Sequence, residues 1–482
     1  MQKQKSLTVN FIMNAILTMS SFVFPLITFP YVSRILLPEG VGKVSFATSV
    51  VSYFAMFAQL GIPTYGIRAC AIVRDDKEEL TRTVHELFLI NLIMSCISYV
   101  ILFIGIINVP KLYQEKKLFF IVSGTIVFNM LGMEWLYKAL EKYTYITIRS
   151  IIFKLFALGG TFLLVHKQED YVYYGAITIF AASASNIFNM FHIHNYISFK
   201  VLKSYHFKRH FKGVAVFFAM SCAATIYTNL DTVMLGFMKS DMYVGYYNAA
   251  VKIKMILVSI VTSLGTVLLP RVSYYVENGF WDEFYRIGSK AINFVMLIAI
   301  PLCSYFMLFA EESIYFLSGE AYSGAIIPMQ IIMPTLILIG LTNVMGIQML
   351  VPMGKEKYVL YSEIAGAGVD LLLNVLLIPS YAAAGAALGT LAAEVVVFGV
   401  QFYFLKKEVI ECFRQIHYGV LLGVSLICTV FSYWIKFLEW NIFFTLAISS
   451  VLFFGIYVFF ICIMKEPLAI EIKKKIVGKF LR

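Results

Sequence analysis

Two carboxylates interrupt an otherwise apolar stretch of the chain, VDLLLNVLLIPSYAAAGAALGTLAAEVVVFG, at residues 369–399. Asp370 lies in its first half and Glu394 in its second, with a proline turn between them. A charged side chain costs about 3 kcal/mol at the centre of a bilayer unless it is paired or hydrated. These carboxylates therefore either form hydrogen bonds between helices or bind a proton or cation that drives transport, with Asp231 and Glu134 as further ion-coupling candidates.

Cations in apolar surroundings offer the complementary chemistry, which is the binding of an anion. Arg34 lies near the expected outer end of a helix, and Lys252 follows soon after the chain re-enters from the same side. Asp231 is expected at a similar depth. The three residues form either a structural ion pair, with Asp231 bonded to one of the cations, or an anion site in which Asp231 moderates the positive field.

Polar side chains at helical spacing extend these candidates. On three apolar runs an asparagine shares one helix face with other polar residues, and these asparagines are Asn14, Asn248 and Asn374. Such stripes either hydrogen-bond between packed helices or line a hydrated cavity. Arginines expected at the inner face either anchor the protein there or contact an anionic substrate, and these are Arg68, Arg149 and Arg271.

The composition indicates that these residues belong to a membrane protein. Of the 482 residues, 60% are hydrophobic and 14% are charged, and the mean hydropathy is +0.81. A soluble domain is nearer half apolar and a quarter charged. The apolar runs are continuous rather than alternating, which favours helices over a β-barrel.

We predict an all-α polytopic protein of about fourteen transmembrane helices, each of roughly 20 residues. The predicted spans are Leu7–Pro30, Val41–Ile67, Glu86–Val109, Leu118–Lys138, Thr147–Val165, Val172–Ile197, Gly213–Phe237, Val244–Leu269, Ile287–Phe309, Ala325–Val351, Tyr358–Pro379, Ala382–Leu405, Tyr418–Ile435 and Asn441–Ile463.

The distribution of cations sets the predicted orientation. Most of the 39 Lys and Arg residues fall in segments that are cytoplasmic when both termini are inside. The main basic segments are residues 68–82, 200–212 and 465–482. The net charge of +11 is thus explained by orientation against anionic lipid, which is favoured over nucleic-acid binding.

Nothing in the sequence predicts a cofactor or an enzyme. The seven cysteines are scattered through helices and inner loops without CxxC pairs, which favours neither a metal site nor disulfides. We find no nucleotide-binding glycine loop and no nucleophile–base pair. Coupling to a proton or sodium gradient is the energy source that remains open.

A weak internal repeat suggests the domain organisation. RILLPEGVGKVSFATSV, from Arg34, and VMLGFMKSDMYVGYYNAAV, from Val233, each read as a helix end, a short outer turn and a new helix. We therefore predict a six-helix lobe at residues 1–212, a second at 213–405, and an appended helix pair with a basic tail at 406–482, with the charged residues lining a cavity between the lobes.

Three segments resemble the Wzx-type polysaccharide flippases of the multidrug/oligosaccharidyl-lipid/polysaccharide (MOP) exporter superfamily. They are FPLITFPYVSRILLPEGVGKVSFATSVVSYFAMFAQLGIPTYGIR, EWLYKALEKYTYITIRS and LNVLLIPSYAAAGAALGTLAAE. The likeness extends over nearly the whole chain. One departure is Ala382, where that family usually has glycine after the Pro-x-Tyr turn.

The resemblance implies a MATE-like fold and a flippase that moves undecaprenyl-diphosphate-linked oligosaccharide repeat units across the bacterial inner membrane for O-antigen, capsule or exopolysaccharide synthesis. It also allows for other polysaccharide-assembly membrane proteins as binding partners. Arg34 and Lys252 would hold the diphosphate. A lipid II or multidrug exporter of the same superfamily is the alternative. A polysaccharide polymerase or glycosyltransferase is disfavoured, because the outer segments are short.

Overall fold

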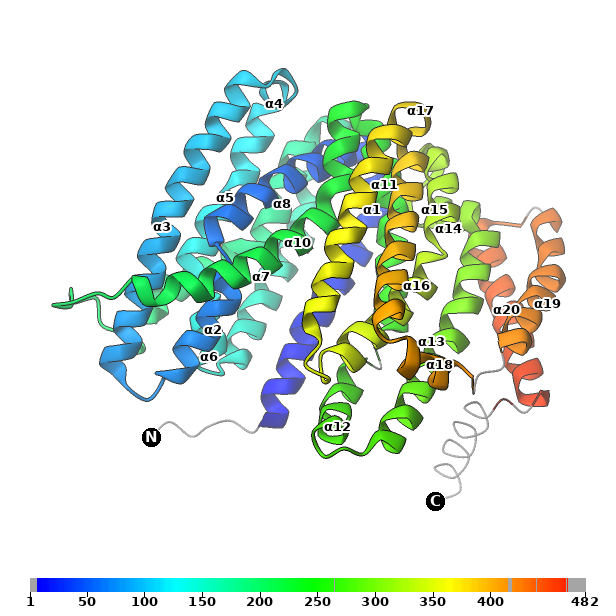
Figure 1. Ribbon diagram of the computed structural model, residues 1–482. Helices are drawn as coiled ribbons and strands as arrows, with labels where there is room; N and C mark the ends of the chain where they lie inside the picture. Colours follow the sequence, from blue (N-terminus) through cyan, green and yellow to red (C-terminus); the bar gives the residue numbers. More distant parts are fainter. Residues whose placement is uncertain (1–6, 264, 415–417, 439, 465, 467–482) are drawn as a thin grey trace. The chain divides into compact units, whose positions relative to one another are not determined.

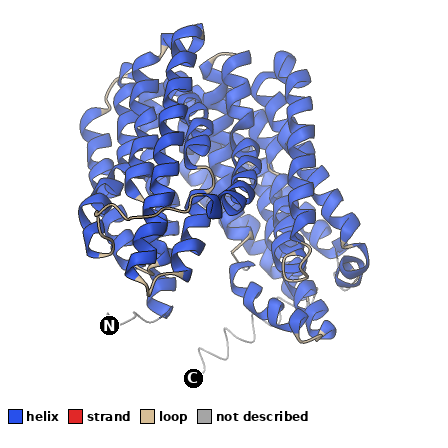
Figure 2. Cartoon of the chain, turned by 60° about the vertical axis from the view of Figure 1, so that its left-hand side comes forward, coloured by secondary structure: helices blue, strands red, loops and turns tan. Residues whose placement is uncertain are grey.

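The computed structural model describes residues 7–263, 265–414, 418–438, 440–464 and 466. Within these ranges the chain forms helices joined by short loops, with no strand (Figures 1 and 2). Ten of the described helices are long and apolar enough to cross a membrane, or eleven if the bent pair Glu320–Ile332 and Thr335–Leu350 is one span. The predicted all-α, multi-pass membrane fold is therefore confirmed, whereas this count by length is lower than the fourteen expected.

The chain divides into two compact units, Met1–Gly245 and Tyr246–Arg482. The helices of the first unit are α1 (Leu7–Gln59), α2 (Ile62–Ile72), α3 (Lys77–Asn108), α4 (Pro110–Gln114), α5 (Lys116–Gly132), α6 (Glu134–Ala139), α7 (Tyr143–Leu164), η1 (Gln168–Asp170), α8 (Tyr171–Ser183), η2 (Ala184–Asn186), α9 (Ile187–His192), η3 (Ile193–Asn195) and α10 (Lys208–Met238). The division falls within α11 (Asp241–Val261).

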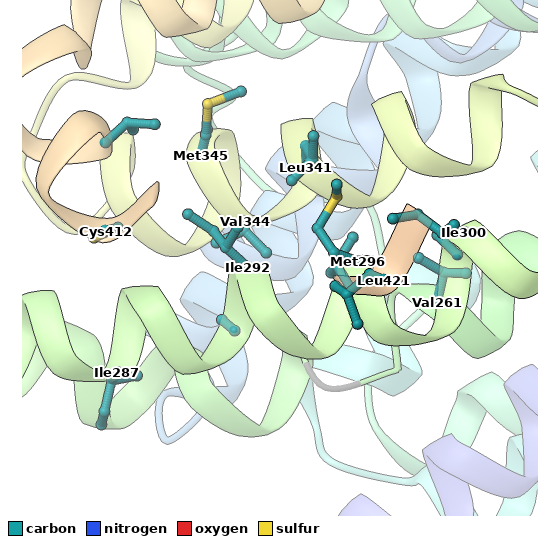
Figure 3. Close-up of a cluster of buried hydrophobic side chains, with 14 of the residues drawn as sticks. Val261, Ile287, Ile292, Met296, Ile300, Leu341, Val344, Met345, Cys412 and Leu421 are labelled. Atoms are coloured by element: carbon teal, nitrogen blue, oxygen red, sulfur yellow. The ribbon is translucent and has the colours of Figure 1, made fainter. Parts of the chain in front are cut away.

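The second unit continues with α12 (Gly265–Glu277), α13 (Trp281–Leu308), α14 (Ala310–Ser318), η4 (Glu320–Ala325), α15 (Ile326–Ile332), α16 (Thr335–Asn343), the π-helical segment η5 (Val344–Leu350), α17 (Glu356–Phe404), α18 (Lys406–Phe413), α19 (Tyr418–Tyr433), η6 (Trp434–Leu438) and α20 (Ile442–Ile463). Its core is apolar. Figure 3 shows α13 residues such as Ile292 and Met296 packed with Leu341, Val344 and Leu421.

Two of the longest helices are each bent into two. In α1 the bend is at Leu37, with φ 58° and ψ 175°, immediately before Pro38. A proline disfavours the helical conformation of the residue before it and donates no backbone hydrogen bond, which explains the bend. In α17 the bend is at Ala382, with φ 47° and ψ −123°. Both bends fall where the sequence predicts a connection between two spans.

Other predicted spans are interrupted. The second ends at Gln59, and the fourth breaks at Met133, which has φ 39°. The span expected to end at Leu269 stops at Val261, and the one at residues 325–351 is divided among α15, α16 and η5. The structural division falls at Gly245 and groups α10 with the preceding helices. The lobe boundaries predicted at residues 212 and 405 stay predictions.

Candidate functional site

The first half of α1 exposes a polar face. Asn14 and Thr18 are exposed, and the Thr18 hydroxyl donates to the Asn14 carbonyl at 2.9 Å. Hydrocarbon cannot solvate an amide, so this face requires water, protein or a polar ligand. The stripe predicted from the spacing of these residues therefore lies on an accessible surface of the helix.

Beside this stripe, α7 buries a cation. The Lys154 side chain is 8% exposed, and its Nζ donates to the Ser20 hydroxyl at 2.8 Å and to the Ser21 hydroxyl at 3.0 Å. Among the described residues no carboxylate lies within 4 Å of Nζ. Two neutral hydroxyls solvate the ammonium without neutralising it, which leaves a field that favours an anion. The sequence showed Lys154 inside a span, but only the structure reveals its partners.

Arg149 is the second buried cation of α7, at 7% exposure. One guanidinium nitrogen donates to Asn186 Oδ1 at 2.9 Å, another donates to Asn189 Oδ1, and Glu134 lies 3.6 Å away. Glu134 also pairs with Lys138 at 2.8 Å. Arg149 is therefore part of a buried network rather than a surface anchor, and Glu134 belongs to this network.

Arg34 and Asp231 both lie in the first unit. Arg34 is exposed one turn before the α1 bend, and its Nη1 donates to the Pro30 carbonyl at 2.6 Å. Asp231, on α10, is 6% exposed. Lys252 belongs to the second unit, where Lys252 and Asn248 are half-buried on α11. The three-residue anion site of Arg34, Asp231 and Lys252 therefore stays a prediction.

Two of the three arginines predicted at the inner face are exposed, in contrast to the buried Arg149. Arg68 lies on α2 in the first unit, and Arg271 lies on α12 in the second. Both are accessible to solvent or headgroups, as either anchoring or substrate contact requires.

In the second unit, α17 forms a hairpin held by close glycine contacts. A Cβ on Gly385 would lie 2.6 Å from the Leu377 backbone. One on Gly389 would lie 2.5 Å from Asn374 Oδ1 and 2.9 Å from Asp370 Oδ1. Figure 1 shows the two halves, yellow and orange, side by side. Asp370 and Asn374 therefore share one face, as their spacing predicts, and that face meets the second half of the hairpin.

Glu394 lies on this second half and is 4% exposed. One turn earlier, Thr390 bonds the Tyr247 hydroxyl at 2.8 Å. Further along the hairpin the Gln401 amide donates to the Ser362 hydroxyl at 3.1 Å. The two buried carboxylates, Asp370 and Glu394, thus lie on a hairpin that also buries Ser362, Asn374, Thr390 and Gln401, and we call this set the polar seam.

The two turn segments of the internal repeat pack on each other within the first unit. A Cβ on Gly42 of α1 would lie 2.7 Å from the Asp241 carbonyl carbon and would overlap the carbonyl oxygen. A Cβ on Gly245 would likewise lie 2.7 Å from the Pro38 carbonyl carbon and would overlap that oxygen. When the segments are aligned by their Val-Gly pairs, Pro38 corresponds to Asp241. The contact is therefore reciprocal, as a two-fold relation between repeats requires.

Ion pairs surround this glycine contact. Lys111 binds Asp241 at 2.7 Å, and Lys43 binds Glu115 at 3.0 Å. The Tyr171 hydroxyl donates to Glu115 at 2.7 Å. All of these groups except Lys43, at the start of the second predicted span, fall in segments predicted to be outside, so they fasten that end of the first unit. Sequence reasoning detected the repeat but missed the contact.

A second cluster that the sequence did not reveal joins α3 to the start of α10. Glu86 is fully buried and accepts from Arg209 Nε at 2.9 Å and from the His206 backbone amide. His210 Nε2 lies 2.7 Å from the same carboxylate, and its Nδ1 lies 2.9 Å from the Tyr65 hydroxyl. This cluster fixes the segment that leads into α10. Only the run of His and Arg at residues 206–210 could have indicated it.

The fold and these intramembrane charges define the class, which is a polytopic membrane protein with a fold shared by known transporters. The structure matches "Lipid II flippase MurJ, inward closed conformation", with a TM-score of 0.71, 16% identity and coverage of 93% of this chain and 98% of that one. An inward-facing multidrug resistance MATE family transporter matches with a TM-score of 0.60, 14% identity and coverage of 85% and 100%.

Sequence comparison identifies the family. A model of the family described as "Polysaccharide biosynthesis protein" matches residues 7–276, and a MatE model matches residues 217–376. The chain belongs to the polysaccharide biosynthesis protein family, and its resemblance to Wzx-type members of the MOP superfamily is confirmed.

Individual relatives agree with this assignment. A protein of Escherichia coli (strain K12) named "Putative O-antigen transporter" is 27% identical over 406 residues, which are 84% of this chain and 97% of that protein. A Haloferax volcanii protein named "Probable low-salt glycan biosynthesis flippase Agl15" is 22% identical over 207 residues, covering 43% and 44%.

Proposed function

We propose that the protein is a flippase for lipid-linked oligosaccharides. Its cargo would be undecaprenyl-diphosphate-linked repeat units, which it moves from the inner to the outer leaflet of the bacterial inner membrane. The observation that carries the proposal is the family match over residues 7–276, joined by a relative named as an O-antigen transporter over 84% of the chain. The intramembrane cations supply the chemistry that an anionic cargo needs.

Each part of such a cargo has a candidate partner. The diphosphate would bind Arg34 and Lys252. We add the buried Lys154, whose ammonium is solvated by the Ser20 and Ser21 hydroxyls, to this set. The sugars would hydrogen-bond to Asn14, Asn248 and Asn374. Arg68 and Arg271, both exposed, would attract the cargo at the cytoplasmic side. In this scheme Asp370 and Glu394 bind the coupling proton or cation, with Asp231 and Glu134 as reserve candidates.

Fourteen spans and two cytoplasmic termini are part of the proposal. The bends at Leu37 and Ala382 divide α1 and α17 into two spans each, which supports a number above the count by length. The helix α5 is apolar but only 17 residues long, so the length criterion leaves it out. The cation distribution supports the orientation.

Alternating access would require the contact between Gly42 and Gly245 to open. Its reciprocal geometry places one turn of each repeat against the other at the predicted outer end. A cargo that leaves for the outer leaflet needs these turns to separate. We therefore treat the glycine contact and its ion pairs as an outer gate.

A lipid II exporter is the second candidate, because the fold match to a lipid II flippase has a TM-score of 0.71. That match is at 16% identity and carries the fold alone. The family match and the sequence relatives favour a polysaccharide precursor.

The test is transport in proteoliposomes with fluorescent undecaprenyl-diphosphate oligosaccharides. Outer-leaflet arrival is measured with a lectin or glycosidase that cannot enter. We expect Lys154→Gln, Arg34→Gln and Lys252→Gln each to lower the rate at least about tenfold, since each removes a charge-assisted hydrogen bond of about 1.5 to 3 kcal/mol.

Lys212→Gln is the matched control, because Lys212 is an exposed lysine on α10. It should transport normally. Faster flipping of lipid II than of oligosaccharide precursors by the unmodified protein would favour the second candidate. Absence of flipping of either lipid would contradict both.

A further inference from the structure

An apolar groove lies on the first unit, and the residues proposed to bind the diphosphate are not among its lining residues. Its volume is about 1060 Å³, and its walls come from α5, α7, α8 and α9. Aromatic and aliphatic side chains form most of the wall, among them Phe128, Ile152, Phe153, Phe156, Phe180 and Phe188. Such a lining suits a hydrocarbon chain.

One end of the groove contains two polar groups with unused donors. Arg149 and Thr144 both line it. Within the described part of the chain, Arg149 Nε and Thr144 Oγ1 are buried atoms without a hydrogen-bond partner. The other guanidinium nitrogens are held by Asn186 and Asn189. A buried donor without a partner costs about 1 to 3 kcal/mol, so a ligand that accepts from either group would stabilise this end.

The position of these donors along α7 matches a lipid headgroup. Arg149 lies in the second turn of α7, which begins at Tyr143, and Phe156 lies about 10 Å further along the helix axis. In the predicted orientation α7 begins at the cytoplasmic face. The cationic end of the groove then lies near the headgroups of the inner leaflet, and the aromatic end lies among the acyl chains.

We propose that this groove binds a glycerophospholipid of the cytoplasmic leaflet, with an acyl chain along α7 and its phosphodiester at Arg149 Nε and Thr144 Oγ1. The number of donors distinguishes this ligand from the diphosphate of the transported lipid. One N–H and one hydroxyl suit a singly charged phosphodiester, and Glu134, 3.6 Å from the guanidinium, opposes a more highly charged head. The proposed lipid site thus uses other side chains than the proposed diphosphate set of Arg34, Lys252 and Lys154.

The experiment is native mass spectrometry of the full-length protein released from delipidating detergent, with defined lipids added. The probes are phosphatidylglycerol, a diacylglycerol with the same chains, and undecaprenyl diphosphate. We expect phosphatidylglycerol to be retained at least about tenfold better than diacylglycerol, since the headgroup hydrogen bonds contribute about 1.5 to 3 kcal/mol.

Two variants locate the site. Ile152→Trp fills the groove without touching the polar network and should lower phosphatidylglycerol retention about tenfold. Thr144→Val, which removes only a hydroxyl, should lower it severalfold. The matched control is Leu163→Trp, on the same helix, exposed and outside the groove lining.

Three results would overturn the proposal. Equal retention of diacylglycerol would show that the headgroup is not recognised. Displacement of phosphatidylglycerol by equimolar undecaprenyl diphosphate would assign the groove to the transported lipid. Unchanged retention by both Ile152→Trp and Thr144→Val would place the bound lipid elsewhere. A failure of the flipping assay would leave this site standing, because lipid retention is measured without transport.

Discussion

Close glycine contacts occur in two regions of the molecule, and the two differ in what they hold together. At Gly42 and Gly245 the obstacle to a larger residue is backbone from the other segment, and the two segments belong to α1 and α11. At Gly389 the obstacle is the side chains of Asn374 and Asp370, within the single hairpin of α17. The first contact joins two segments that would separate in the proposed mechanism, whereas the second lies within one element and includes a carboxylate.

The buried charges of α7 and α17 also differ. In the first unit, Lys154 and Arg149 are cations held mainly by neutral oxygens of Ser and Asn. In the second unit the buried charges of α17 are the carboxylates Asp370 and Glu394. Neutral partners leave a cation able to attract an anion, and a seam of carboxylates attracts a cation. The contrast thus concerns α7 and α17, which bury charges of opposite sign.

The largest expected effect comes from breaking the gate. Gly42→Ala places a methyl group against the Asp241 backbone, so α1 and α11 must move apart. We expect the closed gate to lose about 3 kcal/mol, which shifts its equilibrium about a hundredfold toward opening. Thermal unfolding and accessibility of Asp241→Cys from outside measure the change.

Gly159→Ala on α7 is the control for this substitution, because a Cβ there meets nothing within 4 Å. It should stabilise the protein slightly, by up to about 1 kcal/mol. If Gly42→Ala behaved like this control, the glycine contact would not be the gate.

The next largest effect is expected on the stimulation of transport by an ion gradient. Asp370→Asn combined with Glu394→Gln should leave cargo binding intact and make transport insensitive to an imposed proton or sodium gradient. The expected loss of stimulation is about tenfold, equivalent to about 1.4 kcal/mol of coupling. Vesicle flipping with and without the gradient measures it. A normal gradient response in the double variant would show that these carboxylates only pack helices, and Asp231 and Glu134 would be tested next.

A smaller effect is expected at the hairpin itself. Gly389→Ala should destabilise the protein by about 1 to 2 kcal/mol, because the Asn374 and Asp370 side chains must rotate away from a methyl group. Gly399→Ala, in the same half of α17, meets nothing within 4 Å and should raise stability instead. Denaturation of both variants in the same detergent distinguishes the two glycines. Equal changes would contradict the close contact at Gly389.

The smallest expected effect is a gain in stability. Ala382 has φ 47° at the bend of α17, a conformation that glycine adopts without strain. Ala382→Gly should therefore raise the free energy of unfolding by about 1 kcal/mol, after the greater entropy of glycine in the unfolded chain is subtracted. A lower melting temperature would indicate that the methyl group packs more favourably than the bend costs.

Local patterns predicted some of these features and not others. The helices and the shared face of Asp370 and Asn374 follow from apolar runs and from the spacing of four, which are properties of one helix. The breaks at Met133 and Val261, the Glu86–His210 cluster and the partners of Lys154 depend on residues more than 100 positions apart or on tertiary packing. The glycine pair was visible only as a repeat, because one sequence shows similarity but not contact.

The contrast between the Gly42–Gly245 contact and the α17 hairpin is tested most directly by measuring distances between pairs of spin labels in a cysteine-free background. One pair, Glu39→Cys and Met242→Cys, uses exposed positions beside the glycine contact, and the other, Leu372→Cys and Leu388→Cys, uses exposed positions on the two halves of α17. The proposed mechanism predicts two distances for the first pair, with lipid-linked oligosaccharide changing their populations, and one unchanged distance for the second. A single distance for the first pair under all conditions would contradict an outer gate and, with it, transport by alternating access.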